Sequence, residues 1–192
     1  MNQQTKVTGV ILAGGRASRM HNQDKGLLIY QDKPLISYAI AALAGLTEHI
    51  VINANRNHDR YAQFGFPVIA DANRHFDGPL AGLLAAMNYT DSQILLTMPC
   101  DSPLIKAEQL SKLLCAYAEH DADIAVACVD GHMQPVFLAI NPNLTTSLQQ
   151  YLDSGQRKMA FWLLQHKLLK VDFSAEREHF ININTPADLA AL

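Results

Sequence analysis

The sequence has few charged residues, few cysteines and no long apolar run. Asp, Glu, Lys and Arg make up 17% of the 192 residues, below the average of about 25%, whereas hydrophobic residues make up 49%. This balance argues against a disordered chain and predicts a compact body with a full core. The three cysteines, Cys100, Cys115 and Cys128, are odd in number and widely spaced, so we expect neither a disulfide framework nor a cysteine zinc site. This cysteine use favours the reducing cytoplasm.

Membrane and nucleic-acid partners are not expected either. No apolar run approaches the roughly 18 residues of a membrane span, and the first six residues do not resemble a signal segment. The net charge is −3 and no basic run exceeds two residues, so a nucleic-acid groove is not expected. The eight histidines include no close pair at metal-ligand spacing. The Gly-Lys-Ser/Thr sequence of a Walker loop and the third glycine of the dinucleotide fingerprint are both absent.

Predicted strands and helices alternate along the chain. We expect strands at residues 7–12, 49–53, 67–70, 93–98, 123–128, 136–140 and 168–173, and extended chain at 180–184. Helices are expected at residues 34–46, 58–64, 79–88, 106–120, 144–152, 157–165 and 186–192, the last capped by Thr185. This order predicts one α/β domain over residues 1–192, Rossmann-like and three-layered, with a mostly parallel mixed sheet flanked by helices. The short connection around Gly131 allows one antiparallel strand.

A pair of glycines followed by cations comes directly after the first expected strand. Gly14 and Gly15 end the apolar run and let the backbone approach a ligand closely. Arg16, Arg19 and Lys25 follow within the next ten residues and supply donors and positive charge suited to phosphate. The segment therefore predicts a binding site for a polyphosphate.

Polar residues follow three further strands. Ligands of open α/β sheets bind outside the carboxyl ends of the strands, where Asn53, Asp71 and Asp101 are expected. Asp101 is the candidate magnesium ligand; the alternative is a cap for the helix near residue 106. Asp71 could accept hydrogen bonds from the adjacent donors of guanine, or form an Asx turn. Asn53 could bind the base or ribose, or cap a loop.

Covalent catalysis is not indicated. Cys100 lies beside Asp101 in the sequence, but no nearby histidine supports a nucleophilic role, and a small buried hydrophobe is the favoured interpretation. Ser18 and Ser102 likewise have no evident activating base.

The motifs resemble a known family. Leu12-Ala13-Gly14-Gly15-x-x-x-Arg19-Met20, with Asp24-Lys25, is similar to the signature loop of nucleotidyltransferases of the nucleotide-diphospho-sugar transferase fold. From residue 8 to the C-terminus the chain resembles the molybdenum cofactor guanylyltransferases, with further matching segments at residues 51–56, 78–82, 99–103, 134–136 and 180–186. The resemblance implies a Mg²⁺-dependent enzyme that transfers GMP from GTP to the terminal phosphate of molybdopterin, with or without molybdenum, and releases pyrophosphate. Proteins that make molybdopterin and chaperones of molybdoenzymes are the implied partners.

The resemblance also implies residue roles. It puts the nucleotide-binding part at about residues 1–105 and the acceptor-binding part at about 106–192. The implied nucleotide-binding residues are Leu12, Ala13, Gly14, Gly15, Lys25, Asn53, Asp71 and Asp101. The implied catalytic residues are Lys25, Asp101 and Arg19, and Asp101 is the implied metal ligand. Asn182 and Asn184 are implied to lie near the metal or on the pterin side. For the acceptor, Gln134 could line the cleft, and Arg157 with Lys158 could meet the molybdopterin phosphate or be solvated charges at a helix start.

Two departures from the family pattern stand out. His21-Asn22 follows Arg19-Met20 where relatives carry glycine, and Asn182 stands where many sugar nucleotidyltransferases have a second aspartate. The alternatives are a CTP-dependent molybdopterin enzyme, a sugar-1-phosphate nucleotidyltransferase, and a non-enzymatic GTP-binding cofactor chaperone.

Overall fold

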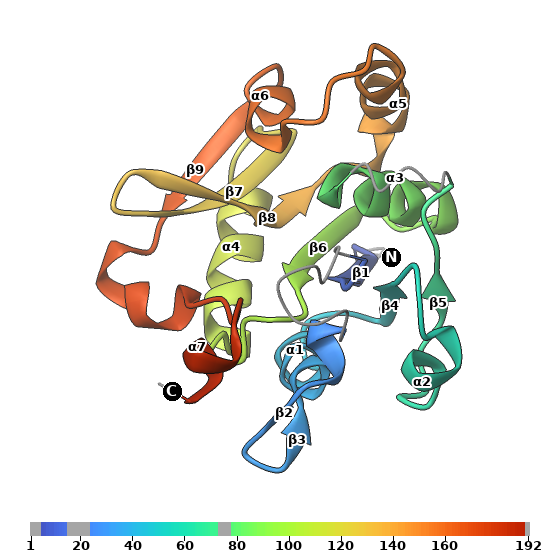
Figure 1. Cartoon of the computed structure of the whole chain (residues 1–192). Coiled ribbons are helices and arrows are strands. Elements are labelled where there is room, and N and C mark those ends of the chain that lie inside the picture. The colour runs from blue at the N-terminus through green and yellow to red at the C-terminus, as the bar shows by residue number, and fades with distance from the viewer. Residues whose placement is uncertain (1–4, 15–23, 73–77, 191–192) are drawn as a thin grey trace.

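The computed structural model describes residues 5–14, 24–72 and 78–190 (Figure 1). Seven strands form one sheet in the order β5-β4-β1-β6-β8-β7-β9. Their bounds are β1 Val7–Leu12, β4 His49–Asn53, β5 Val68–Ile69, β6 Ile94–Pro99, β7 Ile124–Val129, β8 His132–Ile140 and β9 Leu168–Asp172. Every neighbouring pair is parallel except the two pairs of β8, which is antiparallel to β6 and β7. The predicted fold class is confirmed, including the antiparallel strand after Gly131.

The helices and short elements lie between the strands. The α-helices are α1 Leu35–Leu43, α2 His58–Ala62, α3 Pro79–Tyr89, α4 Ala107–Glu119, α5 Thr145–Asp153, α6 Met159–Leu163 and α7 Pro186–Ala190. The described residues also form three 3₁₀ segments, η1 Lys25–Leu27, η2 Pro142–Leu144 and η3 Ser174–Phe180, and a hairpin of β2 Ile29–Tyr30 and β3 Lys33–Pro34. No helix in the described parts of the chain is long and apolar enough to cross a membrane.

Two separate hydrophobic clusters cover the two faces of the sheet. Side chains alternate between the faces of a strand, so Ile11 packs with α1, α2 and α4, whereas Val10 and Leu12 pack with α3, α5 and α6. Figure 1 shows α3, α5 and α6 along one side of the sheet and α1 and α2 on the other. Trp162 of α6 is fully buried in the second cluster. The helices on both faces explain the continuous apolar runs of the parallel strands.

The structure differs from the sequence-based prediction mainly in short segments. The β2–β3 hairpin was not predicted, because its turn residues Gln31 and Asp32 adopt φ of 44° and 66° without a glycine to mark them. Strand β8 begins at His132, four residues before the predicted start, and the register shifts at Val126/Ala127. The 3₁₀ segment η3 was also missed. Helix α1 ends at Leu43, before the turn that contains Gly45.

Candidate active site

The carboxyl ends of four neighbouring parallel strands meet at one edge of the sheet. Strands β5, β4, β1 and β6 lie side by side, with Leu12 in register with Asn53 on one side and Pro99 on the other. The residues that follow these strands therefore come together, as predicted. The backbone N–H of Ala13 donates to the carbonyl of Asn53 at 2.8 Å, so Gly14, the next residue, lies close to the end of β4. Gly15, Arg16, Arg19 and the His21-Asn22 departure lie outside the described residues.

Asp71, which follows β5, accepts hydrogen bonds from two asparagines at the end of β4. Asn53 Nδ2 donates to Asp71 Oδ1 at 2.9 Å, and Asn55 Nδ2 donates to Asp71 Oδ2 at 2.8 Å. Asn55 Oδ1 in turn accepts from the backbone N–H of Asp71 at 2.9 Å. The Asp71 carboxylate faces the two amides, and residue 73, whose N–H an Asx turn would use, lies outside the described residues. Each carboxylate oxygen has a second lone pair, so Asp71 can still accept donors from a ligand.

Two glycines make room for this network of Asn53, Asn55 and Asp71. A Cβ on Gly14 would lie 2.9 Å from Asn55 Nδ2, and a Cβ on Gly82 of α3 would lie 2.2 Å from Asn53 Oδ1. Asn53 is itself 2% exposed, so its side chain has little room to move. The sequence indicated Gly82 only as part of a matching segment; its steric role depends on the packing of α3 against β4. We therefore add Asn55 and Gly82 to the residues that shape this end of the site.

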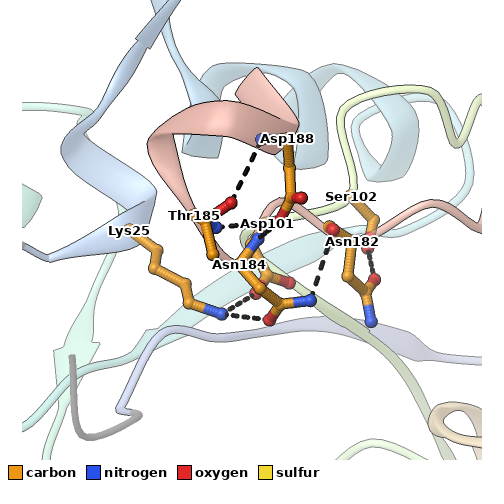
Figure 2. A network of polar contacts seen from close by, with 7 residues as sticks. All are labelled: Lys25, Asp101, Ser102, Asn182, Asn184, Thr185 and Asp188. Carbon is orange, nitrogen blue, oxygen red and sulfur yellow. Dashed lines mark hydrogen bonds and ion pairs between the residues drawn. The ribbon is translucent and has the colours of Figure 1, made fainter. Parts of the chain in front are cut away.

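Lys25 and Asp101 form an ion pair at the other end of the site (Figure 2). Lys25 Nζ donates to Asp101 Oδ2 at 2.8 Å and to Asn184 Oδ1 at 2.7 Å. The Asp101 side chain is 13% exposed, so the pair is only partly screened by water. Helix α4 begins six residues after Asp101 and its first N–H groups do not use this carboxylate; Gln109 Oε1 accepts from the N–H of Lys106 instead. The capping interpretation of Asp101 is therefore wrong.

The segment before α7 brings Asn184 to Lys25. The N–H of Ile183 donates to the carbonyl of Asp101 at 2.8 Å, and Ile183 is fully buried. Asp188 Oδ2 accepts from the N–H groups of Asn184 and Thr185, both at 2.8 Å, while Thr185 Oγ1 accepts from the N–H of Asp188 at 3.1 Å. These bonds lower the pKa of the Asp188 carboxyl below its usual value, the bond from Asn184 contributing most.

The cap by Thr185 was predicted, whereas Asp188 was missed. The pattern Thr185-x-x-Asp188 is a capping-box signature and could have identified Asp188 from the sequence. Asn182 is held next to this segment by Ser102, whose hydroxyl donates to Asn182 Oδ1. Two of the predicted acceptor-side residues, Asn182 and Asn184, therefore lie beside Asp101 and Lys25.

The other two predicted acceptor residues lie on other elements. Gln134 is half-buried near the start of β8, opposite Ala127 of β7, and Arg157 lies in the segment between α5 and α6, which Figure 1 shows at the opposite end of the molecule from α7. Arg157 Nη1 donates to the carbonyls of Leu152 and Gln156, both at 2.7 Å, so the guanidinium caps the end of α5 rather than being a free solvated charge. Arg157 also lines a cavity of about 240 Å³ with Ala72, Ala81, Leu84, Gln149, Leu152 and Asp153.

Cys100 is a buried hydrophobe, as predicted. It is 6% exposed, and burial raises the pKa of its thiol far above the usual value, with Asp101 adding to the effect. A thiol that stays protonated is not a nucleophile. Leu12 is also buried, on the α3 side of the sheet, so any contact that it makes with a ligand is through its backbone.

Comparisons with known proteins identify the family of this chain. The family model described as the MobA-like NTP transferase domain matches residues 9–169. The molybdenum cofactor guanylyltransferase of Shewanella loihica is 43% identical over 181 residues, which cover 94% of this chain and 92% of the relative. The relative from Shewanella halifaxensis has the same name and is 42% identical, covering 94% and 90% of the two chains.

Solved structures share the fold at lower sequence identity. The molybdopterin-guanine dinucleotide biosynthesis protein A from Archaeoglobus fulgidus superposes with a TM-score of 0.81 at 21% identity, over 96% of this chain and 95% of that one. The full-length match at more than 40% identity shows more than a common fold. This chain belongs to the MobA-like NTP transferase family, in which its relatives at 42–43% identity are named molybdenum cofactor guanylyltransferases.

Proposed function

We propose that this chain is a nucleotidyltransferase that transfers GMP from GTP to the terminal phosphate of molybdopterin, forming the guanine dinucleotide form of the molybdenum cofactor and releasing pyrophosphate. The observation that carries the proposal is the Lys25–Asp101–Asn184 cluster beside the network around Asp71, at one edge of the sheet. The names of the relatives at 42–43% identity support the choice of GTP and molybdopterin.

The nucleoside would bind at the Asp71 end of the site. The carboxylate of Asp71 has free acceptor capacity for the adjacent N1–H and amino donors of guanine, which cytosine and uracil lack. The backbones of Leu12, Ala13 and Gly14 would face the base and ribose, because β1 ends between Asn53 and the end of β6. Asn53 would keep Asp71 oriented through the 2.9 Å hydrogen bond between them.

The phosphates would bind toward Lys25. Its ammonium is a point charge suited to phosphate and would stabilise the negative charge on the leaving pyrophosphate, with Gly15 and Arg19 assigned to the same task. Lys25 would exchange part of its contact with Asp101 for the phosphates when GTP binds. The Asn184 amide oxygen, 2.7 Å from Lys25 Nζ, would keep the ammonium directed toward the site.

The donor atoms at Asp101 fit a magnesium ion. Magnesium takes oxygen ligands, uses one or two carboxylates and keeps waters and substrate phosphates as its other ligands. Asp101 supplies a carboxylate, and the side-chain oxygens of Asn182 and Asn184 lie in the adjoining segment. We assign the metal to Asp101. When bound, the ion would neutralise charge on the phosphates and polarise them.

The reaction needs positioning and charge rather than a general base. A terminal phosphate oxygen of molybdopterin, already anionic, attacks the α-phosphorus of GTP in line. The new P–O bond forms as the bond to the β-phosphate oxygen breaks, and pyrophosphate leaves. The protonated, buried Cys100 takes no part.

The acceptor would approach from the second half of the chain. We assign nucleotide binding to about residues 1–105 and acceptor binding to about residues 106–192, with Asn182, Asn184, Gln134 and Arg157 as its candidate contacts. The three cysteines are free, which supports a reducing cytoplasmic location, where proteins that make molybdopterin or escort molybdoenzymes are the expected partners.

The test is incubation of the purified protein with molybdopterin, Mg²⁺ and one nucleoside triphosphate at a time, with the product read by mass. We expect the guanine dinucleotide and pyrophosphate with GTP, and loss of turnover when Mg²⁺ is removed. Preferential use of CTP, or GTP binding without turnover, would overturn the proposal.

A further inference from the structure

The carboxylate of Asp24, directly before Lys25, is buried and held by the loop after β4. Its side chain is only 5% exposed. Arg56 Nη2 donates to Asp24 Oδ1, and Asn57 Nδ2 donates to Asp24 Oδ2 at 2.7 Å. We call Asp24, Arg56 and Asn57 the Asp24 clamp. A buried carboxylate that has both a cation and an amide donor is held in one position, since losing the cation would leave its charge unpaired and losing the amide would leave one oxygen without its donor.

Residues of the Asp24 clamp also form backbone hydrogen bonds with α2 and with η1. Asn57 has left-handed backbone geometry, with φ of 50°, and its carbonyl accepts from the N–H groups of Arg60 and Tyr61 at the start of α2. On the other side, the carbonyl of Asp24 accepts from the N–H of Leu27 at 3.0 Å, which forms the turn of η1. The position of Asp24 therefore determines where η1, and with it Lys25, lies relative to the β4–α2 loop.

The segment around Lys25 also packs closely against α2 and the end of β6. A Cβ on Gly26 would lie 2.9 Å from Tyr61 Oη and 3.2 Å from Cys100 Sγ, so the backbone next to Lys25 rests on α2 and the end of β6. Tyr61 is fully buried, and its hydroxyl has no hydrogen-bond partner among the described residues. The Tyr61 hydroxyl thus acts by occupying space, and of the amino acids only glycine fits next to it at position 26.

We propose that Asp24 is a positioning residue: its clamp by Arg56 and Asn57 fixes η1 so that Lys25 Nζ meets Asp101 and the phosphates. The inference rests on the proposed function, because Lys25 acts there on the transferred nucleotide. The clamp also links the two ends of the site, since the loop that carries Arg56 and Asn57 begins at Asn53 and Asn55. The same stretch of chain therefore contacts Asp71, through Asn53 and Asn55, and the residue before Lys25, through Arg56 and Asn57.

The first test compares Asp24→Asn and Asn57→Gly with the wild-type protein. Asn57→Gly removes the amide donor but tolerates the left-handed backbone, so it is the milder variant. A displacement of about 1 Å can cost about 10²-fold in rate, and we expect kcat for GMP transfer to fall about 10- to 100-fold in Asp24→Asn. We expect the amides of Leu27 and Leu28, which close η1, to exchange with solvent at least about tenfold faster.

Glu176→Gln is the matched control. Glu176 also binds one cation and one amide, because Lys112 Nζ and Gln109 Nε2 both donate to it at 2.8 Å, but it holds η3 to α4 rather than η1 to the β4–α2 loop. This variant should keep kcat and the exchange of Leu27 and Leu28 within about twofold of wild type. An equal fall of kcat in Glu176→Gln would overturn the positioning role, because general loosening would then explain both variants.

The decisive test repeats Asp24→Asn in a Lys25→Met background. If Asp24 acts through Lys25, the variant lowers kcat in the wild-type background and causes no further fall when Lys25 is absent. Equal falls in both backgrounds, or unchanged exchange of Leu27 and Leu28 in Asp24→Asn, would overturn the inference. Full activity of Lys25→Met would instead overturn the role of Lys25 in the proposed function, and the exchange measurement would still judge the clamp by itself.

Discussion

The two ends of the candidate site are built in different ways. The end proposed for the nucleoside is local: Asn53 and Asn55 donate to Asp71, which is 18 and 16 residues away, and all three lie at or just after the ends of the adjacent strands β4 and β5. The phosphate end is assembled over long distances, because Lys25 reaches Asp101 and Asn184, which are 76 and 159 residues away. We therefore expect that substitutions of Asp71 and of Asp101 affect the proposed reaction differently.

The largest expected effects come from replacing the aspartate at each end of the site with asparagine. Asp101→Asn keeps an oxygen for Lys25 but removes the charge that would hold Mg²⁺, and we expect kcat to fall about 10²–10³-fold. Asp71→Asn should leave kcat within about threefold and raise the KM for GTP about tenfold or more, because it loses a charged acceptor. Steady-state kinetics of GMP transfer measures both, with thermal unfolding as the check on folding. Equal effects on kcat would contradict the division into two ends.

Gly82→Ala tests the nucleoside end through packing. The added methyl would lie 2.2 Å from Asn53 Oδ1, so either Asn53 or α3 must move. We expect the free energy of unfolding to fall by about 1–3 kcal/mol and the KM for GTP to rise, with a smaller change in kcat. Gly45→Ala is the control, since a Cβ there meets nothing within 4 Å. Denaturant unfolding gives the stability, and an unchanged KM in Gly82→Ala would show that Asn53 does not support the nucleoside.

Gly26→Ala makes the corresponding change at the phosphate end. Its Cβ would press on Tyr61 Oη at 2.9 Å and displace the backbone beside Lys25, so kcat should fall about tenfold with little change in KM. Tyr61→Phe removes the hydroxyl and should restore part of that loss in the double variant. By itself, Tyr61→Phe should not destabilise the protein, because the hydroxyl has no partner among the described residues. A double variant no better than Gly26→Ala would contradict the steric explanation.

The smallest expected effect is the contribution of Asp188 to the pH dependence of folding stability. Asp188 has a pKa lowered from 3.8 by the N–H groups of Asn184 and Thr185. Its contribution to folding stability is therefore complete above the usual carboxyl pKa and is lost as pH falls through the lower folded-state value. An NMR titration of Asp188 should show a midpoint below 3.8. Asp188→Asn should remove this part of the acid dependence of unfolding, and an ordinary midpoint would argue against the cap.

The prediction from the sequence was accurate for the placement of residues that directly follow a parallel strand. Asp71 and Asp101 were predicted at one edge because the carboxyl ends of parallel strands align, whatever their order in the sheet. The helix cap at Asp101 was equally compatible with the sequence, and only the contacts of Asp101 with Lys25 and of Lys106 with Gln109 decided against it. Gly82 could not be assigned a role, because its close approach to Asn53 depends on how α3 packs against β4.

The sequence by itself determined the α/β alternation, the polar residues at the strand ends and the glycine–cation loop, because each depends on local periodicity or on a few adjacent residues. Only the tertiary structure decided that Asn184 meets Lys25 while Arg157 caps α5. The physical reason is that pairing of distant side chains depends on the order of strands in the sheet and on the docking of the last segment, in which the buried Ile183 binds the backbone of Asp101.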